Sequence, residues 1–294
     1  MLNFKEIEKS DIEEYKKYYD YSNAIGCEYN LLNAYLWRKE YPVKFAVYDD
    51  TLIRAYFREN GTLWVYCMPT GKNIKGALYE ILVDADERGI NPELILLTNG
   101  QKAMLESLCP SKFVFERDPV NQDYVYLTKD LVMLAGKKYH AKRNHISRFY
   151  RTYNETHFET LDSSNQNDAI KVVLEWCKEN NVNPDYHKEV EIISEALQLR
   201  DEFGMKGALI YVEDKPVAMT LGSEISPLAF DIIFEKALRA YDGLYAVINN
   251  EFAKILTQYE YINREEDMGI EGLRKSKLSY NPYIIIDRYI AKLK

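Results

Sequence analysis

Hydrophobic residues recur at helical intervals in some stretches of the chain and alternate with polar residues in others. In the first half, helices are predicted at 11–19, 29–38, 74–87 and 101–108, and strands at 43–48, 51–57, 62–66, 93–98, 113–115 and 123–127. The two-residue polar turn Asp49-Asp50 predicts a hairpin between the first two of these strands. The first half is therefore expected to combine a small sheet with flanking helices.

The same order of elements recurs in the second half. Helices are predicted there at 167–178, 189–201, 244–254 and 270–277, and strands at 207–212, 216–221, 228–234, 259–263 and 283–287. The stretch Phe45-Ala-Val-Tyr-Asp-Asp is echoed by Leu209-Ile-Tyr-Val-Glu-Asp, and an apolar strand follows each. A duplicated domain explains this agreement; chance recurrence of common elements is the alternative. We therefore predict an α/β (α+β) fold of two tandem domains, 1–133 and 157–294, with mixed sheets flanked by helices and a connecting helix at 134–156.

The connecting helix concentrates positive charge. Between Leu134 and Tyr153 it holds six Lys and Arg residues and two of the four histidines, without a single Asp or Glu. At helical spacing its apolar residues form one arc and its cations a neighbouring stripe. The arc consists of Tyr139, Ile146, Phe149, Tyr150 and Tyr153, and the stripe of Lys138, Lys142, His145 and Arg148. Two interpretations are open: a solvated basic face that balances acidic neighbours, or a surface that binds phosphates.

The composition narrows the class of protein. Of 294 residues, 47% are hydrophobic and 29% charged, which is typical of a globular protein with a sizeable core. A formal net charge of −8 argues against a protein that coats nucleic acid without specificity. The four cysteines lie far apart, which favours neither a zinc site nor a disulfide scaffold. With no signal peptide and no apolar run of membrane-spanning length, we expect a cytoplasmic protein with no bound metal and no transmembrane segment.

The order of elements resembles that of the N-acetyltransferase (GNAT) fold, here in tandem. In that fold, a glycine-containing loop after the central strand opens a helix whose N-terminus binds a pyrophosphate, because free backbone N–H groups and the helix dipole favour an anion there. The loops Gly71–Gly76 and Ala240–Gly243 take this place. The resemblance implies Gly243 as a cofactor-binding residue if the donor is an acyl-CoA. A plain turn before a helix explains either loop at least as well.

A more specific resemblance rests on the basic run, on Phe230-Asp-Ile-Ile-Phe234, and on the stretch Asn263-Arg-Glu-Glu-Asp-Met-Gly269 with its basic continuation to Lys277. These stretches are similar to the C-terminal catalytic domain family of bacterial phosphatidylglycerol lysyltransferases, in particular its short soluble members, over roughly residues 29–286. That family is related to the Fem aminoacyl transferases. The resemblance implies transfer of an aminoacyl group from aminoacyl-tRNA to a hydroxyl or amine acceptor, with the active site in the second copy.

Individual residues match the family pattern unevenly. Asp231 matches the Phe-Asp pair on the central strand. Asn263 and Gly269 match the later Asn-x-Gly signature, with an insertion between them. The basic residue that often follows the Phe-Asp strand is replaced by Phe234 and Glu235. The acceptor is therefore left open among a small molecule, a peptide and a lipid.

Acyl transfer requires a base for the acceptor, polarisation of the acyl carbonyl and return of a proton to the leaving group. The candidate catalytic residues are Asp231, Glu265, Asp267 and Tyr280. The candidate substrate-binding residues are Lys138, His140, Lys142, Arg143, Asn144, Asn263, Arg264 and Lys277. The structural alternatives are a surface-facing strand position for Asp231, a solvated acidic loop for the residues after Asn263, and a packed tyrosine for Tyr280.

Three functions follow from these observations. The first is an acyltransferase that uses aminoacyl-tRNA, whose acceptor-stem phosphates the basic helix would bind, and that needs no cofactor. The second is an N-acyltransferase that uses acyl-CoA. The third is a non-catalytic binding protein that retains the fold.

Overall fold

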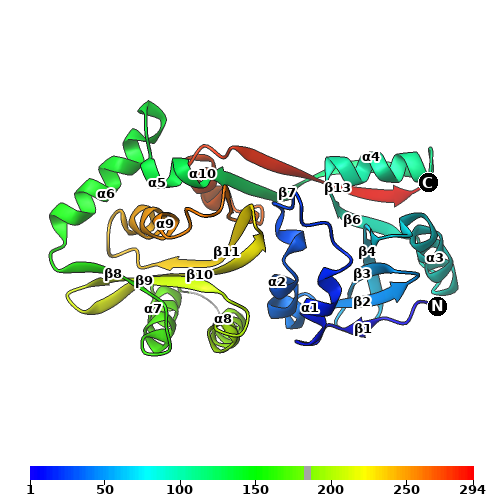
Figure 1. Ribbon diagram of the computed structural model, residues 1–294, viewed down its shortest axis with the longest axis horizontal. Coiled ribbons are helices and arrows are strands. Elements are labelled where there is room, and N and C mark those ends of the chain that lie inside the picture. The colour runs from blue at the N-terminus through cyan, green and yellow to red at the C-terminus, as the bar shows by residue number, and fades with distance from the viewer. Residues whose placement is uncertain (182–186) are drawn as a thin grey trace.

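The computed structural model of the protein describes residues 1–181 and 187–294, which form an elongated molecule of two halves (Figure 1). The strands are β1 (Lys5–Glu6), β2 (Val43–Tyr48), β3 (Thr51–Phe57), β4 (Leu63–Cys67), β5 (Thr70–Gly71), β6 (Glu93–Leu97), β7 (Phe113–Leu127), β8 (Thr156–Thr160), β9 (Lys206–Val212), β10 (Lys215–Ser226), β11 (Ala229–Ala237), β12 (Tyr261–Asn263) and β13 (Ile284–Leu293). The α-helices are α1 (Asp11–Lys16), α2 (Leu31–Leu36), α3 (Ile74–Glu87), α4 (Asn99–Leu108), α5 (Thr128–Met133), α6 (His140–Thr152), α7 (Gln166–Glu179), α8 (His187–Leu199), α9 (Leu244–Lys254) and α10 (Glu271–Leu278), and the 3-10 helices are η1 (Cys27–Tyr29), η2 (Trp37–Lys39) and η3 (Lys137–Tyr139).

One mixed sheet runs through both halves. Its strand order is β1-β2-β3-β4-β6-β13-β7-β12-β11-β10-β9-β8, and β5 pairs with β3 outside this path. The last strand of the chain, β13, pairs with β6 and β7, and β7 also pairs with β12. Figure 1 shows β7 and β13 extending between the halves. The predicted α/β architecture with mixed sheets and flanking helices is confirmed, with the difference that one sheet serves both halves. The predicted domain bounds stay a prediction.

The strand β7 is longer than its hydrophobic pattern indicates. Two separate strands, 113–115 and 123–127, were expected, but the structure has one strand of 15 residues. The middle of β7 is polar and largely exposed, so no alternation marks it as a strand. Pairing with β13 keeps this polar segment extended, because β13 runs along the whole of β7, with Leu293 opposite Phe113 and Ile284 opposite Val125.

The two predicted hairpins are confirmed. Asp49 and Asp50 have φ angles of 43° and 54°, and Glu213 and Asp214 have φ angles of 50° and 60°. Two successive residues with positive φ are the requirement of a tight two-residue hairpin turn, whose twist matches that of the strands. The turns therefore repeat the same backbone geometry in both halves.

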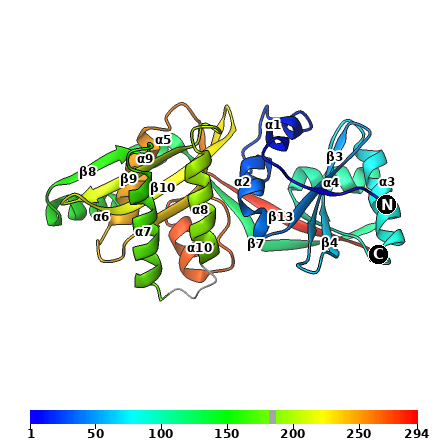
Figure 2. The same ribbon diagram turned by 90° about the horizontal axis from the view of Figure 1, so that it is seen from below.

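Helices cover both faces of the sheet in the second half. The helices α7 and α8 lie on one face of β9 to β11, and α9 lies on the other (Figures 1 and 2). Each face has its own hydrophobic cluster: Val172 and Ile193 belong to one, and Val247 and Phe252 to the other. The strands between them are consequently apolar on both sides.

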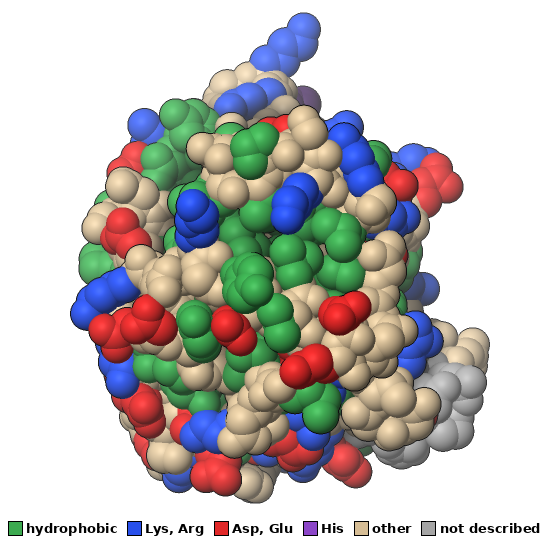
Figure 3. Space-filling model, turned by 90° about the vertical axis from the view of Figure 1, so that its right-hand side faces the viewer, with side chains coloured by type: hydrophobic (Ala, Val, Ile, Leu, Met, Phe, Trp, Pro, Cys, Tyr) green, Lys and Arg blue, Asp and Glu red, His purple; other side chains and the backbone are tan. Residues whose placement is uncertain are grey.

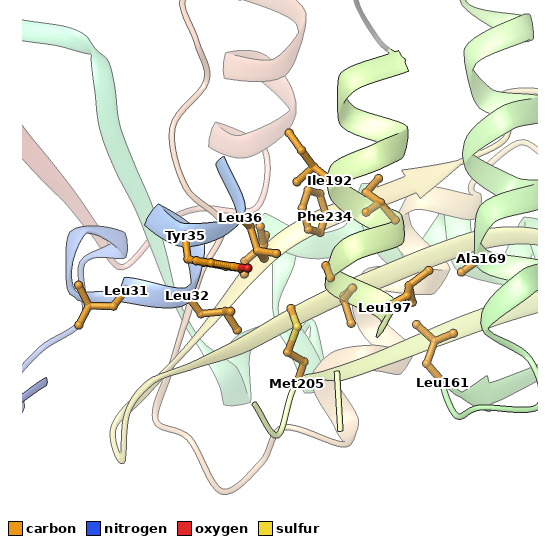
Figure 4. Packing of buried hydrophobic residues seen from close by; sticks show 14 of the residues in the cluster. Leu31, Leu32, Tyr35, Leu36, Leu161, Ala169, Ile192, Leu197, Met205 and Phe234 are labelled. Atoms are coloured by element: carbon orange, nitrogen blue, oxygen red, sulfur yellow. The ribbon is translucent and has the colours of Figure 1, made fainter. Parts of the chain in front are cut away.

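The short helix α2 joins the cores of the two halves. Its Leu31, Leu32 and Leu36 are buried in one cluster with Ile192 and Phe234 of the second half (Figure 4). Burial of each such side chain contributes about 1.5–3 kcal/mol. This packing brings the residues at the start of α2 close to β11.

The basic connecting helix begins later than expected, since η3 precedes α6. Tyr139 and Phe149 are buried, and Ile146 and Tyr153 pack against the hydrophobic cluster that contains Phe149. The prediction for Tyr150 was wrong, because its side chain is 44% exposed and its hydroxyl donates to Glu251 at 3.1 Å. The apolar arc is thus narrower than helical spacing alone suggested.

Hydrophobic side chains also gather on the surface at the end of the molecule formed by the first half (Figure 3). The exposed hydrophobic residues of this half include Trp64 and Tyr79, which are 55% and 66% exposed. Apolar positions predicted from the sequence pattern are therefore not all interior positions.

Candidate functional site

The candidate site lies where the parallel strands β11 and β12 stop pairing, a point that we call the second fork. Their last paired residues are Asp231 and Asn263. The carboxyl ends of parallel strands are the usual place for ligands in α/β proteins. The carboxyl group of Asp231 is fully buried, which excludes the surface-facing position considered for it.

Asp231 is held by a residue from the other half of the chain. The side-chain amide of Asn30, the N-cap of α2, donates to Asp231 Oδ2 and to Ser223 Oγ, both at 2.9 Å. Asp231 Oδ1 has no hydrogen-bond partner among the described residues. Burial, together with the nearby charges of Asp123 and Glu266, raises the pKa of Asp231 to about 8.

Two further carboxyl groups, those of Glu265 and Glu266, follow Asn263 in the chain and are half-buried. The side-chain amide of Asn33 donates to Glu265 Oε1, and the Glu265 backbone N–H donates to Asn263 Oδ1 at 2.7 Å. Burial raises the pKa of Glu265 well above its usual value, and the charges of Asp231 and Glu266 add to the effect. The pKa of Glu266 is also raised by burial. We call Asp231, Glu265 and Glu266 the acidic cluster.

A buried arginine binds a separate pair of carboxylates behind the fork. Arg288 Nη2 lies 2.5 Å from Glu28 Oε2 and 2.7 Å from Asp123 Oδ1. Although burial opposes it, the Arg288 guanidinium keeps the pKa of Asp123 below its usual value. Asn263 Nδ2 donates to Asp123 Oδ2 at 2.8 Å and so connects this ion pair to the fork.

The same group contains three potential metal ligands. Cys27, Glu28 and Asp123 each offer a ligand atom, and these atoms lie within 4.8 Å of one another. The guanidinium of Arg288 already binds both carboxylates, and burial raises the pKa of the Cys27 thiol well above its usual value. A thiol must lose its proton to bind a metal. The group is therefore suited to a guanidinium and poorly suited to a metal ion.

Cationic side chains lie on the other side of the fork. Arg264 Nη2 pairs with Glu235 Oε1 at 2.7 Å, and the Arg264 guanidinium lies 4.9 Å from the centre of the Tyr280 ring. Lys142 Nζ lies 3.7 Å from the centre of the same ring. Burial, with a contribution from the charge of Arg264, lowers the pKa of Lys142 to about 8. The structure thus brings together Lys142, Arg264 and Tyr280, which are far apart in the sequence.

Lys277 completes this region but pairs with no carboxylate of the described residues. Its ammonium group donates to the backbone carbonyls of Arg264 and, at 3.0 Å, of Glu265. Burial and the charge of Arg264 lower its pKa. Lys277 therefore holds the loop that carries the acidic cluster.

Other predicted residues are engaged elsewhere. Asp267 accepts hydrogen bonds from Tyr124 at 2.6 Å and from Arg274 at 2.7 Å, so its carboxylate is already satisfied. Lys138 pairs with Asp130 at 3.1 Å. The Arg143 guanidinium binds the backbone carbonyls of Leu134 and Gly136, and the Asn144 amide lies 3.4 Å from His140 Nδ1. These contacts place them outside the second fork, and any role in catalysis or binding stays a prediction.

The N-terminus of α9, where the GNAT resemblance implied a pyrophosphate site at Gly243, is covered. Gly243 has a φ of +86°, and a Cβ atom there would meet the backbone oxygen of His145 at 2.6 Å. The amide of Leu244 donates to Tyr241 O at 3.2 Å. Arg148 pairs with Asp242 at 2.6 Å across the same contact. The helix α6 therefore occupies the space in front of α9.

Sequence reasoning missed several residues of the site, namely Glu28, Asn30, Asn33, Asp123 and Arg288. Asn30 alone left a local signal, because an asparagine before an apolar helix is typical of an N-cap. The others act through contacts between residues far apart in the chain, which no local pattern reveals.

Comparison with known proteins agrees with this picture. The family described as phosphatidylglycerol lysyltransferase, C-terminal, matches residues 19–292. A conserved protein of unknown function from Bacteroides thetaiotaomicron has 38% sequence identity, covers all of both chains and superposes with a TM-score of 0.91. L-PGS from Bacillus licheniformis is 15% identical, with a TM-score of 0.67 over 98% of this chain and 93% of its own.

Two further proteins are similar to this chain, one in its fold and the other over part of its sequence. A GNAT-family acetyltransferase from Colwellia psychrerythraea, 10% identical, has a TM-score of 0.53 over 99% of this chain and all of its own. The GNAT-like character of the fold is thereby confirmed. An uncharacterised protein of Mycoplasmoides gallisepticum is 25% identical over 173 residues, and the match spans 56% of its length. Among the described residues, no helix is long and apolar enough to span a membrane.

Proposed function

Since the chain belongs to the phosphatidylglycerol lysyltransferase C-terminal family, whose fold and relatives are those of acyltransferases, we propose that it transfers an aminoacyl group. The donor in this proposal is aminoacyl-tRNA, and the acceptor is a hydroxyl or an amine. The observation that carries the proposal is the acidic cluster at the second fork.

The acidic cluster has no ion-pair partner among the described residues, because the nearby Lys277 donates to backbone carbonyls. No described Lys or Arg lies within ion-pair distance of the carboxyl groups of Asp231, Glu265 or Glu266. Buried carboxyl groups without a counter-charge stay protonated near neutral pH, and they ionise when a cationic ligand binds beside them. The α-ammonium group of an aminoacyl ester is a cation of suitable size. Its binding would favour ionisation of Asp231 and provide a partner for the free Oδ1 atom.

The roles of the individual groups follow from their positions. Asp231, which is deepest, binds the ammonium group. Glu265, which is half-buried, accepts the proton of the attacking hydroxyl or amine after the bound ammonium group has shifted its carboxyl group to the ionised form. The new bond forms at the ester carbonyl carbon, and the bond from that carbon to the ribose oxygen of the tRNA breaks. Burial keeps the pKa of Tyr280 above its usual value, so its hydroxyl stays protonated and returns a proton to the ribose oxygen.

The basic helix supports a nucleic-acid donor. Among the described cations of this segment, Lys138 forms an ion pair with Asp130, and Arg148 forms one with Asp242. Lys137 in η3 and Arg151 in α6 are exposed and have no carboxylate partner among the described residues. Exposed cations without such partners are suited to phosphate contacts.

The covered N-terminus of α9 argues against the acyl-CoA alternative in the second half. In the first half, the N-cap Asn73 accepts a hydrogen bond from the Gly76 amide at 2.9 Å, so the start of α3 is also satisfied by the protein itself. An aminoacyl-tRNA donor does not require either position.

The test is equilibrium binding of aminoacylated and deacylated tRNA to the full chain, followed by transfer assays with the aminoacyl-tRNAs that bind. We expect the aminoacylated form to bind more tightly, and Asp231→Asn to remove the difference. Glu271→Gln, which removes a carboxylate that is 79% exposed, is the matched control and should preserve the difference. Equal binding of both tRNA forms, or binding of acetyl-CoA in place of tRNA, would reject the proposal.

A further inference from the structure

The first half contains a counterpart of the second fork. The parallel strands β4 and β6 stop pairing at Cys67 and Ile95, as β11 and β12 do at Asp231 and Asn263. We call this point the first fork. By the register of β3 and β4, Arg54 lies opposite Cys67, just as Ser223 lies opposite Asp231. An arginine thus occupies the position next to the first fork that a serine occupies next to the second.

Arg54 is a half-buried cation without a counter-charge. Its Nε lies 3.3 Å from Cys67 Sγ, and its Nη1 lies 3.4 Å from the backbone oxygen of Glu28. No carboxylate of the described residues lies within ion-pair distance of its guanidinium. Glu28, whose backbone oxygen contacts Arg54, has its carboxylate bound by Arg288 at 2.5 Å. Two long contacts with neutral groups leave most of the donors of Arg54 unused.

A cavity of about 30 Å³ lies at the first fork beside Arg54. Its lining includes Tyr19, Tyr29 and Gln101, which carry hydrogen-bond donors, and the strand ends at Cys67 and Ile95. Glu28 also lines it, but its carboxylate is paired with Arg288. Donors of this kind around a guanidinium are complementary to an anion.

We propose that the first fork is a second ligand site, which binds the carboxylate of a small molecule through Arg54. The cavity has room for only one compact anionic group. The planar guanidinium can form a bidentate pair of hydrogen bonds with a carboxylate. The site is distinct from the acidic cluster and does not depend on the proposed transfer reaction. Its ligand has the opposite charge to that of the second fork.

A purely structural role explains Arg54 less well. A buried charge that serves the fold is normally paired, because removal from water costs several kcal/mol that only a counter-ion offsets. Arg288 follows this rule with two carboxylates, whereas Arg54 has none among the residues that the structure describes. An incoming carboxylate would supply the missing charge.

The experiment measures the thermal unfolding midpoint of the full chain while acetate replaces chloride at constant ionic strength. Saturating acetate, at about ten times its dissociation constant, should raise the midpoint by about 2–4 °C. Arg54→Gln should lose most of this shift. Arg58→Gln, which removes an exposed arginine just beyond the same strand, should keep it. Because Arg54 carries no ion pair, Arg54→Gln should unfold no earlier than the wild type in chloride.

Three outcomes would overturn the proposal. The first is a wild-type midpoint that does not respond to acetate. The second is a shift of equal size in Arg54→Gln, which would point to binding on the basic helix. The third is a response to inorganic phosphate without one to acetate, which would contradict the argument from size. If Arg54→Gln does not fold, Arg54→Lys takes its place, since it keeps the charge but loses the two-point geometry and should weaken the acetate response.

Discussion

The two forks of this molecule share a backbone plan and differ in the sign of their charge. At each, two parallel strands stop pairing beside a strand of an antiparallel hairpin. The second fork presents Asp231 with Glu265 and Glu266 nearby, and the first presents Arg54 beside Cys67. The difference teaches that the fold supplies a position where side chains converge, while the residues placed there decide which ligand charge is accepted.

The two forks are also joined through a common ion pair. Glu28 offers its backbone oxygen to Arg54 and its carboxylate to Arg288. Arg288 in turn binds Asp123, which accepts a hydrogen bond from Asn263 at the second fork. Among the described residues, a triad of Arg288 with Glu28 and Asp123 therefore separates a cation without an ion pair from a group of carboxyl groups without one.

The largest effect is expected at the second fork. Asp231→Asn should lower aminoacyl transfer by about 100-fold or more, because a buried partner of the ligand's ammonium group is lost. Arg54→Gln should leave transfer within about threefold of the wild type, a small change on the free-energy scale. Single-turnover rates with a saturating donor measure both. Equal losses in the two variants would show that the forks do not act separately.

The ion pair between the forks is expected to dominate stability. Arg288→Met should lower the free energy of unfolding by about 3–5 kcal/mol, because it leaves Glu28 and Asp123 buried without a counter-charge. Arg117→Met is the control, since Arg117 is 59% exposed and its ion pair with Asp287 should contribute about 0–1 kcal/mol. Urea denaturation followed by circular dichroism measures both values. Similar losses for the two variants would contradict the assignment of Arg288 as the link.

The free energy of unfolding should depend on pH through Asp231 at the second fork. The folded protein holds a proton on Asp231 up to about pH 8, whereas the unfolded chain loses it near pH 4. Stability from this group is therefore present at low pH and falls by up to about 1.4 kcal/mol per pH unit as the pH rises toward 8. Denaturation at pH 6 and pH 8.5 should show a smaller decrease for Asp231→Asn than for the wild type. An identical decrease would mean that Asp231 is already ionised in the free protein.

The smallest effect is expected on the basic helix. Replacing Lys137 and Arg151 together by glutamine should weaken tRNA binding. It should also reduce the magnitude of the slope of log K against log salt by about 1–2, because fewer counter-ions are released when fewer phosphates are contacted. Lys171→Gln, which removes an exposed lysine from α7, is the control. Filter binding at several salt concentrations measures the slope. An unchanged slope in the double variant would remove the basic helix from the donor site.

Local sequence patterns predicted the helices and hairpins that recur in the two halves. The helix α3 has the bounds that its apolar spacing indicates, and both hairpin turns follow from paired acidic residues between alternating strands. Asp231 was selected because it matches the Phe-Asp pair of the family that the sequence resembles, and the loop after Asn263 because sites in α/β folds usually lie at strand ends. Asp267 was selected by the same reasoning, but its carboxylate is bound by Arg274 and Tyr124.

By itself, the sequence determined which segments form helices and hairpins, where the basic helix lies, and that the order of elements occurs twice. Only the tertiary structure decided that β13 joins both halves into one sheet, that Asn30 reaches Asp231, and that Arg288 is paired while Arg54 is not. The physical reason is the range of the interactions. Helical spacing and turn geometry are set by neighbouring residues, whereas the pairing of buried charges depends on residues more than 100 positions apart.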